Sequence, residues 1–386
     1  MMLGLFLARR GVRVQLLEVQ KDFDRDFRGD TVHPSTLNVL QQLDLAKPLL
    51  TLPHGRIRQL RIITPERTIT PVDFGVLGGD FPFTAIMPQV DFLNFILAEA
   101  DRFETFRCTT GCGVTGLLRN ASGDVTGVQC RTADDEHEVR ARVVIAADGR
   151  FSRLRKLSGL PAERRAPPMD VCWFRMSRHQ ADPEDAGAFY INQGRMLVCI
   201  PRAEGWQLGY VFPNGNFSAV REAGLPQFRE ALGQTAPWLD SRLDEIQSFD
   251  DLHLLRVESN CLKTWHLPGL LLIGDAAHAM SPVGGVGINA AIADAVATAN
   301  RIGPHLLGSG RITEAMLAQV QRDRALITRI IQAAQAAMQA VIVRRALQSK
   351  PFELPWPARL ITSTPGLRSL PPRIFAVGVR QPVLTF

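Results

Sequence analysis

The sequence predicts an α/β protein whose doubly wound domain is interrupted by a mainly antiparallel β-sheet. Two apolar runs, residues 143–147 and 270–273, have the pattern of parallel strands buried on both faces. Each run leads into an acidic residue beside a glycine, Asp148-Gly149 in one case and Gly274-Asp275 in the other. Between them, from about 167 to 260, short alternating segments separated by turns predict the antiparallel sheet.

The N-terminal residues predict a helix followed by a strand. Leu3 and Leu7 follow helical spacing, Gly11 ends the helix, and residues 12–17 have the pattern of a strand that closes at Glu18. In a doubly wound domain an acid at this position accepts hydrogen bonds from ribose hydroxyls of a dinucleotide. The segment therefore predicts the second half of an opening βαβ unit, with Glu18 as a binding residue.

The most specific segment runs from 269 to 289 and combines a strand end, a glycine-rich loop and a helix N-terminus. The strand end projects the Asp275 carboxylate into a crevice, where it can bond sugar-alcohol hydroxyls. Glycines let the backbone approach a flat ring, and the helix N-terminus supplies N–H donors and positive potential. The pattern therefore indicates a cofactor with both a polyol chain and a planar ring.

A second segment, residues 147–155, places Asp148 and Gly149 after the other buried strand, followed by a serine and two arginines at a helix start. An Asp-Gly pair after a strand is common and is weak evidence alone. Because this pair precedes the 269–289 segment in the chain, the two segments together are stronger evidence for a binding site. For Arg153 two readings stay open, a contact with a phosphate or a surface ion pair.

Taken together, these segments resemble the class A FAD-dependent monooxygenases, the aromatic-ring hydroxylases of the para-hydroxybenzoate hydroxylase type. Residues 269–289 resemble the family's "GD" motif nearly position for position, and residues 147–155 its "DG" motif. The resemblance covers roughly residues 1–299 and implies a doubly wound FAD-binding domain of the glutathione-reductase type. The residues to which it gives FAD-binding roles are Glu18, Arg28, Gln89, Asp148, Asp275, Pro282, Gly285, Gly287, Ile288 and Asn289.

The resemblance also implies what each contact does. Asp275 would hold the ribityl chain, Pro282 would pack by the isoalloxazine ring, and backbone at 287–289 would meet the pyrimidine edge of the ring. Arg28 corresponds to an arginine on the FAD pyrophosphate, and Gln89 to a glutamine near the ribityl phosphate. Positive potential at the helix N-terminus would stabilise the anionic reduced ring.

In the resembling family, a strand and a Gly-x-Gly-Pro-Ala-Gly loop come directly before residues like Met1 and Met2. We therefore expect a FAD-binding domain that lacks its first strand, with a misassigned start or a trimmed sequence as the cause. Missing backbone donors to the pyrophosphate would cost several hydrogen bonds, at ~1.5–3 kcal/mol each. One alternative is accordingly a truncated chain with impaired FAD binding and no activity.

The chemistry that the resemblance implies is hydroxylation. In that family NAD(P)H reduces the flavin, O2 adds to flavin C4a, and the hydroperoxide transfers an OH to an electron-rich ring. We therefore expect a monooxygenase acting on a small aromatic substrate, with FAD as cofactor and NAD(P)H and O2 as co-substrates. No second G-x-G-x-x-G is present, as expected of a family without a separate nicotinamide domain. A FAD-dependent reductase of the same fold stays an alternative, because fold does not fix function.

Substrate is expected between the antiparallel sheet and the flavin, at the domain interface. Half of the candidate wall residues should face elsewhere, because strand side chains alternate. These candidates are Met196, Val198, Ile200, Tyr210 and Phe212. No catalytic base is assigned. The titratable side chains considered for that role, with a structural role favoured for each histidine, are Tyr190, Tyr210, His33, His179 and His278.

The chain is predicted to have three parts. Residues 1–70, 89–166 and 261–340 form the FAD-binding domain, and residues 71–88 and 167–260 the substrate domain. Residues 341–386 form a basic, Pro-rich C-terminal cover. This cover carries seven arginines and lysines against one acid, which leaves 37 basic and 37 acidic residues in the rest of the chain.

Composition narrows the remaining possibilities. A basic tail on an otherwise neutral chain is read as a solvated cover, with contact to a membrane surface left open. We expect no transmembrane segment, no nucleic-acid binding and a cytoplasmic location, and we make no prediction of oligomeric state. The six scattered cysteines predict reduced thiols and no metal site.

Overall fold

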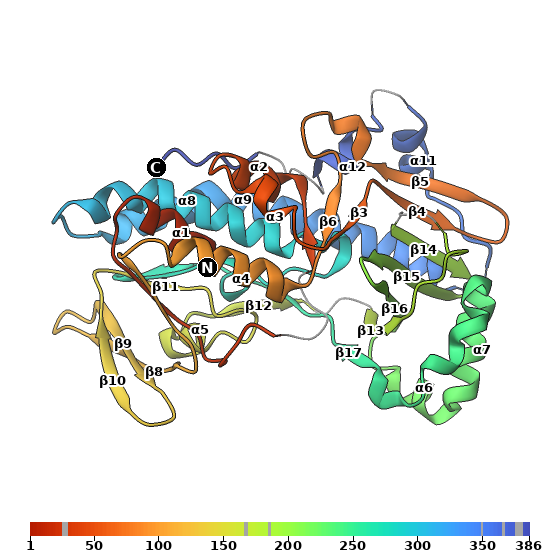
Figure 1. The fold of residues 1–386 in the computed structure, drawn as a ribbon, viewed down its shortest axis with the longest axis horizontal. Helices are drawn as coiled ribbons and strands as arrows, with labels where there is room; N and C mark the ends of the chain where they lie inside the picture. The colour runs from red at the N-terminus through yellow and green to blue at the C-terminus, as the bar shows by residue number, and fades with distance from the viewer. Residues whose placement is uncertain (25–29, 166–168, 184–186, 349, 365–366, 375–380) are drawn as a thin grey trace.

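The computed structural model describes residues 1–24, 30–165, 169–183, 187–348, 350–364, 367–374 and 381–386. Figure 1 shows two regions side by side, one built on short parallel strands and one on a larger antiparallel sheet. The predicted mixed α/β fold with an antiparallel second region is confirmed.

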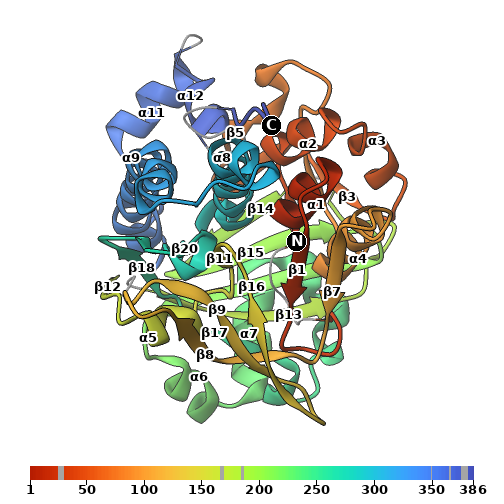
Figure 2. The ribbon, with the colours of Figure 1, turned by 90° about the vertical axis from the view of Figure 1, so that its left-hand side faces the viewer.

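The first region is built from short parallel strands. Strand β1 (Val14–Leu17) pairs in parallel with β7 (Phe106–Thr109), and β11 (Val144–Ala146) pairs in parallel with β20 (Leu270–Leu272). Antiparallel β19 (His266–Leu267) flanks β20. Within the described part of the chain these pairs form separate sheets, and Figure 2 shows β1 and β7 on one side, with β11 and β20 on the other.

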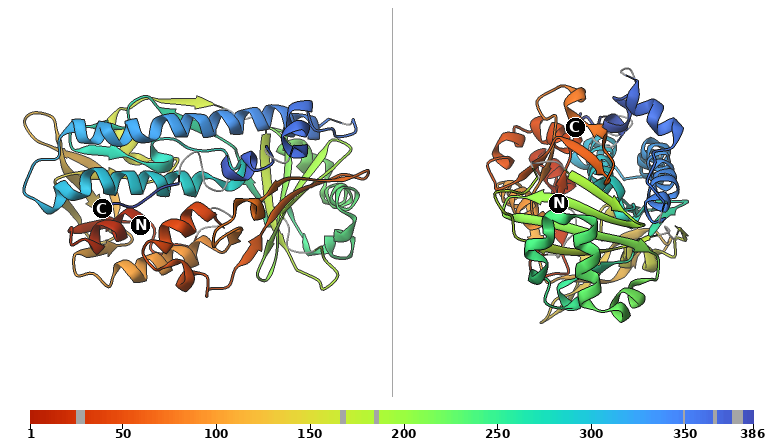
Figure 3. Two further views of the ribbon diagram at one scale, coloured as in Figure 1. Left: turned by 90° about the horizontal axis from the view of Figure 1, so that it is seen from above. Right: turned by 90° about the vertical axis from the view of Figure 1, so that its right-hand side faces the viewer.

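Helices enclose these strands. Helix α1 (Met2–Arg9) packs on α4 (Gln89–Ala100) and on α8 (Gly287–Leu307), with the Phe6 ring fully buried between them. Helix α9 (Glu314–Met338) lies along α8, and Figure 3 shows the two running side by side through most of the molecule's length. The long helices therefore connect both regions.

The second region is a seven-stranded sheet in which every neighbouring pair is antiparallel except β14 and β4. In order across the sheet the strands are β17 (His253–Leu255), β13 (Met169–Met176), β16 (Gly205–Pro213), β15 (Arg195–Arg202), β14 (Gly187–Asn192), β4 (Gln59–Ile63) and β5 (Thr68–Asp73).

The two faces of this sheet have different surroundings, because side chains alternate along each strand. On one face Phe174, Leu197 and Leu208 are fully buried against helix α7 (Leu225–Thr235) and its neighbour α6 (Phe217–Ala223). The opposite face lines a large cavity that reaches the parallel strands. One face of the sheet is thus packed against helices, and the opposite face, called the open face below, borders the cavity.

Shorter elements link the two regions. They are the sheet β2 (Thr31–Val32), β6 (Thr84–Ile86) and β3 (Gly55–Ile57), the sheet β8 (Gly113–Arg119), β9 (Val125–Arg131) and β10 (Glu136–Arg140), the pair β12 (Ala162–Arg165) and β18 (Ser259–Leu262), and helices α2 (Pro34–Gln41), α3 (Ala46–Leu49) and α5 (Arg153–Ser158). Strands β4 and β5 join the large sheet, whereas β6 pairs outside it. The predicted boundary between residues 70 and 71 therefore cuts through β5, and the domain limits stay a prediction.

The C-terminal segment covers the cavity. Helix α9 continues through a π-turn (Gln339–Val343) into α10 (Arg344–Ala346), and α11 (Trp356–Ser363) and α12 (Leu370–Pro372) follow. Side chains of α11 and α12 line the cavity. By length and composition alone, 314–346 is the one helical stretch among the described residues that could cross a bilayer, which is weak support for a membrane span.

A buried ion pair joins the 3-10 helix that follows α7 (Pro237–Glu245) to the loop that follows β13. Arg242 pairs with Asp182, and both side chains are 3% exposed. The Asp182 carboxylate also accepts from Trp206 Nε1 at 2.7 Å and from the His179 backbone N–H at 2.9 Å. Burial alone would raise the pKa of Asp182, but these donors, with Arg242 foremost, outweigh it and lower the pKa to about 2.

Replacing Arg242 with methionine should lower the free energy of unfolding by about 3–5 kcal/mol at pH 7, because Asp182 keeps a buried, unpaired charge. Since Asp182 titrates below its ordinary pKa of 3.8, its contribution is present above about pH 4 and is lost as pH falls toward 2. Urea unfolding at pH 7, 4 and 3 should show the difference shrinking. Lys263→Met, which breaks the exposed pair with Glu163, should cost less than ~1 kcal/mol. Equal losses in both variants would contradict the argument.

Candidate functional site

One cavity of about 2820 Å³ extends from the parallel strands to the open face of the large sheet. Its lining includes the carboxyl end of β1 at Glu18, the end of β20 at Asp275 and the N-terminus of α8 at Gly287. It also includes Val198 and other apolar side chains of the large sheet. Most of the residues predicted to bind FAD and part of the predicted substrate wall therefore share one continuous space.

Arg155 joins the two motif segments that the sequence analysis singled out. It is 9% exposed, and its guanidinium donates to the backbone carbonyls of Asp275 at 3.3 Å and Ala276 at 3.0 Å, and to that of Arg150 at 2.5 Å. Arg150 itself lies 3.8 Å from the Asp275 carboxylate. The strand ends after β11 and β20 are thus fixed to one another.

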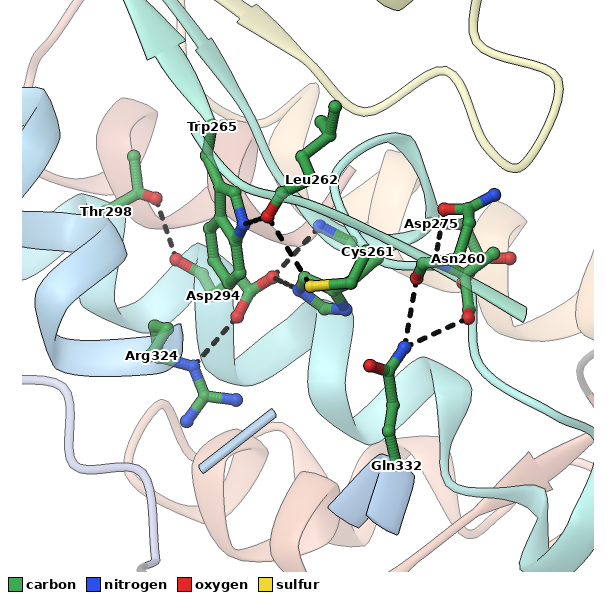
Figure 4. Close-up of polar contacts among 12 residues, drawn as sticks. Asn260, Cys261, Leu262, Trp265, Asp275, Asp294, Thr298, Arg324 and Gln332 are labelled. Atoms are coloured by element: carbon green, nitrogen blue, oxygen red, sulfur yellow. Dashed lines mark hydrogen bonds and ion pairs between the residues drawn. The ribbon is translucent and has the colours of Figure 1, made fainter. Parts of the chain in front are cut away.

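Asp294, a fully buried carboxylate on α8, holds the turn that presents Asp275. It accepts from the Gly274 backbone N–H at 2.9 Å, from His278 Nε2 at 2.6 Å and from Arg324 Nε at 2.8 Å. Figure 4 shows Asp294 between Arg324 and the indole of Trp265, with Asp275 on the far side of the group. One carboxylate thereby joins a strand end and two helices.

Burial by itself would raise the pKa of Asp294, but His278 and Arg324 outweigh it and lower the pKa to about 2. Asp294 is therefore ionised at neutral pH. A buried charge is stable only when it is paired and hydrogen-bonded, as this one is. The network is consequently sensitive to the loss of any one partner.

Glutamines on the buried side of α9 hold the loop that follows. Gln335 Nε2 donates to the carbonyls of Ser281 at 2.9 Å and Val283 at 2.7 Å, and Gln339 Nε2 donates to the Ser281 hydroxyl at 2.5 Å. Gln332 Nε2 donates to Asn260 O at 3.0 Å (Figure 4). These bonds bracket Pro282 and fix the loop against the helix.

Two glycines in this segment are required by close approach. Gly274 has φ +58°, and a Cβ there would lie 3.0 Å from the Ala291 Cβ on α8. Gly285 has φ +63°, and a Cβ there would lie 2.8 Å from Thr31 Oγ1. Both positions need the left-handed backbone that glycine adopts readily.

Most of the predicted FAD-binding residues lie around the cavity. Glu18 and Gln89 line it, and the Gln89 backbone N–H donates to Asp30 at 3.2 Å. The part of the 269–289 segment that lines it is Asp275, Pro282, Gly285, Gly287 and Ile288. Asn289 is held instead by Thr36, whose hydroxyl lies 2.9 Å from Asn289 Oδ1. Arg28 lies outside the described residues, and the binding roles stay predictions.

Asp148 lines the cavity but its carboxylate is engaged locally. It accepts from the Ser152 hydroxyl at 2.5 Å and from the Leu154 backbone N–H at 3.0 Å, at the start of α5. The same helix start leaves Arg153 exposed at the cavity edge. Asp148 therefore orders the turn after β11 in addition to any contact with a ligand.

The predicted substrate wall divides between the two faces of the sheet. Met196, Val198 and Ile200 line the cavity, whereas Tyr210 and Phe212 pack on the opposite face toward α7. Burial raises the pKa of Tyr190 to about 12 and also raises that of Tyr210, and neither lines the cavity. A tyrosine pair therefore does not face the cavity. Exposed His179 sits by Ser177, and buried His278 belongs to the Asp294 network.

Cys112, Cys130 and His137 form a small cluster in the β8–β10 sheet, with their ligand atoms within 4.8 Å of one another. Burial, followed by the neighbouring Cys112, raises the pKa of Cys130 to about 11. A metal binds the thiolate, so this environment opposes metal binding. The sequence-based prediction of no metal site therefore stays a prediction.

Sequence reasoning missed Arg155, Asp294 and the α9 glutamines. A signal for the last group was available, since Arg324, Gln332, Gln335 and Gln339 recur at spacings that place them on one face of a helix. Gln335 and Gln339 are buried because Ser281 and Val283 offer them acceptors, and Arg324 is buried against Asp294.

The residues present suit a flavin nucleotide. The cavity offers a carboxylate at Asp275, a helix N-terminus at Gly287 and a glycine turn at Gly285 that a side chain would obstruct. Helix N-termini favour negatively charged groups, and glycine lets a planar ring approach the backbone.

Comparison with known proteins agrees with this fit. A family profile described as "FAD binding domain" matches residues 1–334. The chain is 31% identical over 377 residues to the 6-methylpretetramide 4-monooxygenase of Streptomyces rimosus, covering 96% of this chain and 88% of that protein.

Solved structures share the fold. That of p-nitrophenol 4-monooxygenase PnpA from Pseudomonas putida DLL-E4 superposes with a TM-score of 0.75 at 18% identity, covering 97% of this chain and 90% of that one. PqsL from Pseudomonas aeruginosa, described as a probable FAD-dependent monooxygenase, gives a TM-score of 0.74 at 20% identity, with 90% and 93% covered. With the profile and the full-length relative, these matches establish that the chain belongs to the FAD-dependent monooxygenases, in the class A aromatic-hydroxylase group, and that FAD is its cofactor.

Proposed function

We propose that this monooxygenase uses NAD(P)H and O2 to hydroxylate an apolar aromatic substrate held between the flavin and the open face of the large sheet. The observation that supports this most strongly is the single cavity shared by the 282–287 loop and by Val198 and its neighbours. A site for the cofactor and a site for an apolar ring are thereby in contact.

When bound, FAD supplies the redox chemistry, accepting a hydride from NAD(P)H and activating O2. The chain's own contribution is to bind and orient. Asp275 would accept hydrogen bonds from the ribityl hydroxyls, and the N–H groups at Gly287 would direct positive potential toward the ring. The α9 glutamines keep Pro282 and its loop in one position. Such preorganised donors act without reorganisation during the reaction.

The substrate side of the cavity is suited to exclude water. Val171, Phe189, Met196 and Val198 present apolar side chains from neighbouring strands, and Ile361 of α11 closes the outer side. An enclosed apolar site limits loss of the activated oxygen to water and keeps the reacting ring oriented.

The substrate class is suggested by the relative and not by the volume of the cavity, because the cavity also extends between β1 and β11, away from the large sheet. The likeness to a protein named for 6-methylpretetramide supports a polycyclic phenol as the substrate class. A cytoplasmic location, with the six cysteines as free thiols, is part of the proposal.

The first test is the purified chain with added FAD. We expect bound flavin bands in the visible spectrum, and NAD(P)H oxidation with O2 uptake that increases when 6-methylpretetramide is added. Mass spectrometry should show that the product of 6-methylpretetramide has gained one oxygen atom. We expect 4-nitrophenol to be a poorer substrate than 6-methylpretetramide. If NAD(P)H is consumed and 6-methylpretetramide is reduced without uptake of O2, the enzyme is a reductase. A chain without flavin bands after FAD addition would instead support impaired FAD binding.

Replacing Gln335 with leucine should weaken FAD binding about tenfold, because two buried carbonyls beside Pro282 lose their donor. Flavin fluorescence titration measures this loss. The control is Gln319→Leu on the same helix, where Gln319 makes local surface contacts with Arg322 and Asp323. An equal loss of FAD affinity in the control would mean that α9 has no specific effect on the loop.

Enlarging Val198 to tryptophan should obstruct the substrate and spare the cofactor. We expect kcat/KM for 6-methylpretetramide to fall about tenfold or more, since overpacking costs roughly 1–3 kcal/mol, while FAD affinity changes less than about twofold. Val383→Trp, at a valine that is 55% exposed, is the matched control and should leave both values unchanged. A Val198→Trp enzyme with normal kcat/KM would place the substrate elsewhere.

A further inference from the structure

His33 has a buried polar atom that the rest of the described chain leaves without a partner. It caps the N-terminus of α2 by position and is 3% exposed. Its Nδ1 lies 3.5 Å from the Thr84 hydroxyl, and its ring stands edge-on to Phe74 at 6.5 Å. Its Nε2 makes no hydrogen bond of normal geometry among the described residues, although the backbone of Gly284 and Gly285 interacts with the ring. Buried polar atoms are usually satisfied, so this one needs an explanation.

The free nitrogen lies at the flavin loop. His33 lines the cavity, and a Cβ built on Gly285 would be 3.4 Å from its Nε2. Thr31, two residues earlier, donates its hydroxyl to the Gly285 carbonyl at 3.0 Å. The strand β2 and the start of α2 thus pack directly against the turn that precedes α8. His33 is on the cavity side of that contact.

The chemistry of His33 favours a neutral donor. Burial lowers the pKa of His33 to about 4. It outweighs the interactions with the backbone of Gly285 and Gly284, which act to raise the pKa, so the imidazole is neutral at pH 7. A neutral imidazole carries one N–H and one acceptor nitrogen. If the Thr84 hydroxyl donates to Nδ1, the proton resides on Nε2 and is directed away from Thr84. His33 then presents an N–H donor at the wall of the cavity.

A purely structural histidine elsewhere in the chain provides the contrast. His278 also has one ring nitrogen without a partner, Nδ1. Its other nitrogen, however, bonds Asp294 at 2.6 Å, and its ring packs on Trp265 at 4.7 Å. His278 does not line the cavity, whereas His33 does. Of these two histidines, His33 is the one that combines an unsatisfied ring nitrogen with a place beside the flavin loop.

We propose that His33 contacts the cofactor, donating a hydrogen bond from Nε2 to the isoalloxazine ring of FAD and stabilising the ring's reduced, anionic form. This inference rests on FAD as the cofactor and not on which substrate is hydroxylated. A donor to an anionic ring strengthens on reduction, because hydrogen bonds to charged groups are stronger than those to neutral ones. His33 therefore favours binding of reduced over oxidised FAD.

The test compares the reduction potential and visible spectrum of FAD bound to His33→Leu, His33→Gln and the wild-type holoprotein. In His33→Leu, affinity for reduced FAD should fall about tenfold more than affinity for oxidised FAD. That ratio lowers the potential by about 30 mV for this two-electron couple. His33→Gln keeps a donor and should recover at least half of the shift. His54→Leu, at a histidine bonded locally to Leu52 O at 2.8 Å, should leave the potential unchanged.

The results separate the alternatives. A wild-type potential and spectrum in His33→Leu would overturn the proposal, even if hydroxylation continued. An unchanged potential with a raised KM would assign His33 to the substrate and would also overturn it. If His33→Leu binds no FAD, Thr84→Val and His33→Gln decide the matter. We expect a smaller shift in the same direction in Thr84→Val, and wild-type potentials in both variants would contradict a flavin contact.

Discussion

The arrangement of the site depends on one buried carboxylate, Asp294. It binds the Gly274 backbone N–H at the end of β20, together with His278 after the turn and Arg324 on α9. Without Asp294, the Gly274 N–H and two buried polar side chains would lose their acceptor. The direction in which Asp275 enters the cavity follows from that turn. The carboxylate is stable only because three donors surround it, so the network forms as a unit.

The large sheet adds the second constraint. Alternation sends Phe174, Leu197 and Leu208 to α7 and sends Val198 and Met196 to the cavity, so one sheet is both anchored and open. The C-terminal helices α11 and α12 close the outer side of the same space. The cavity thus has a cofactor motif on one side and an apolar wall on the other. Side chains on the open face of the sheet, such as Val198 and Met196, can be replaced without touching the Asp294 network.

Local sequence patterns were sufficient for the mixed α/β fold and for the strand ends at Asp148 and Asp275, because buried strands and glycine turns have strong local signatures. They also predicted that the wall candidates would divide between faces, as Val198 and Tyr210 do. Local sequence patterns did not reveal the tertiary contacts of the site. Arg155, Asp294 and Gln335 are polar residues on helices, and only the packing of those helices on the 274–283 backbone shows that they are buried. The engagement of Asp148 by its own helix start is likewise a matter of three-dimensional geometry.

Flavin and substrate are expected to meet between the 282–287 loop and the open face of the sheet. A crystal structure of the chain saturated with FAD tests it most directly. We expect the isoalloxazine ring beside Pro282 and Gly285, with its ribityl chain at Asp275 and open space toward Val198. A ring bound outside this cavity, or one that fills the space against Val198 and Met196 and leaves no room for a substrate, would contradict it.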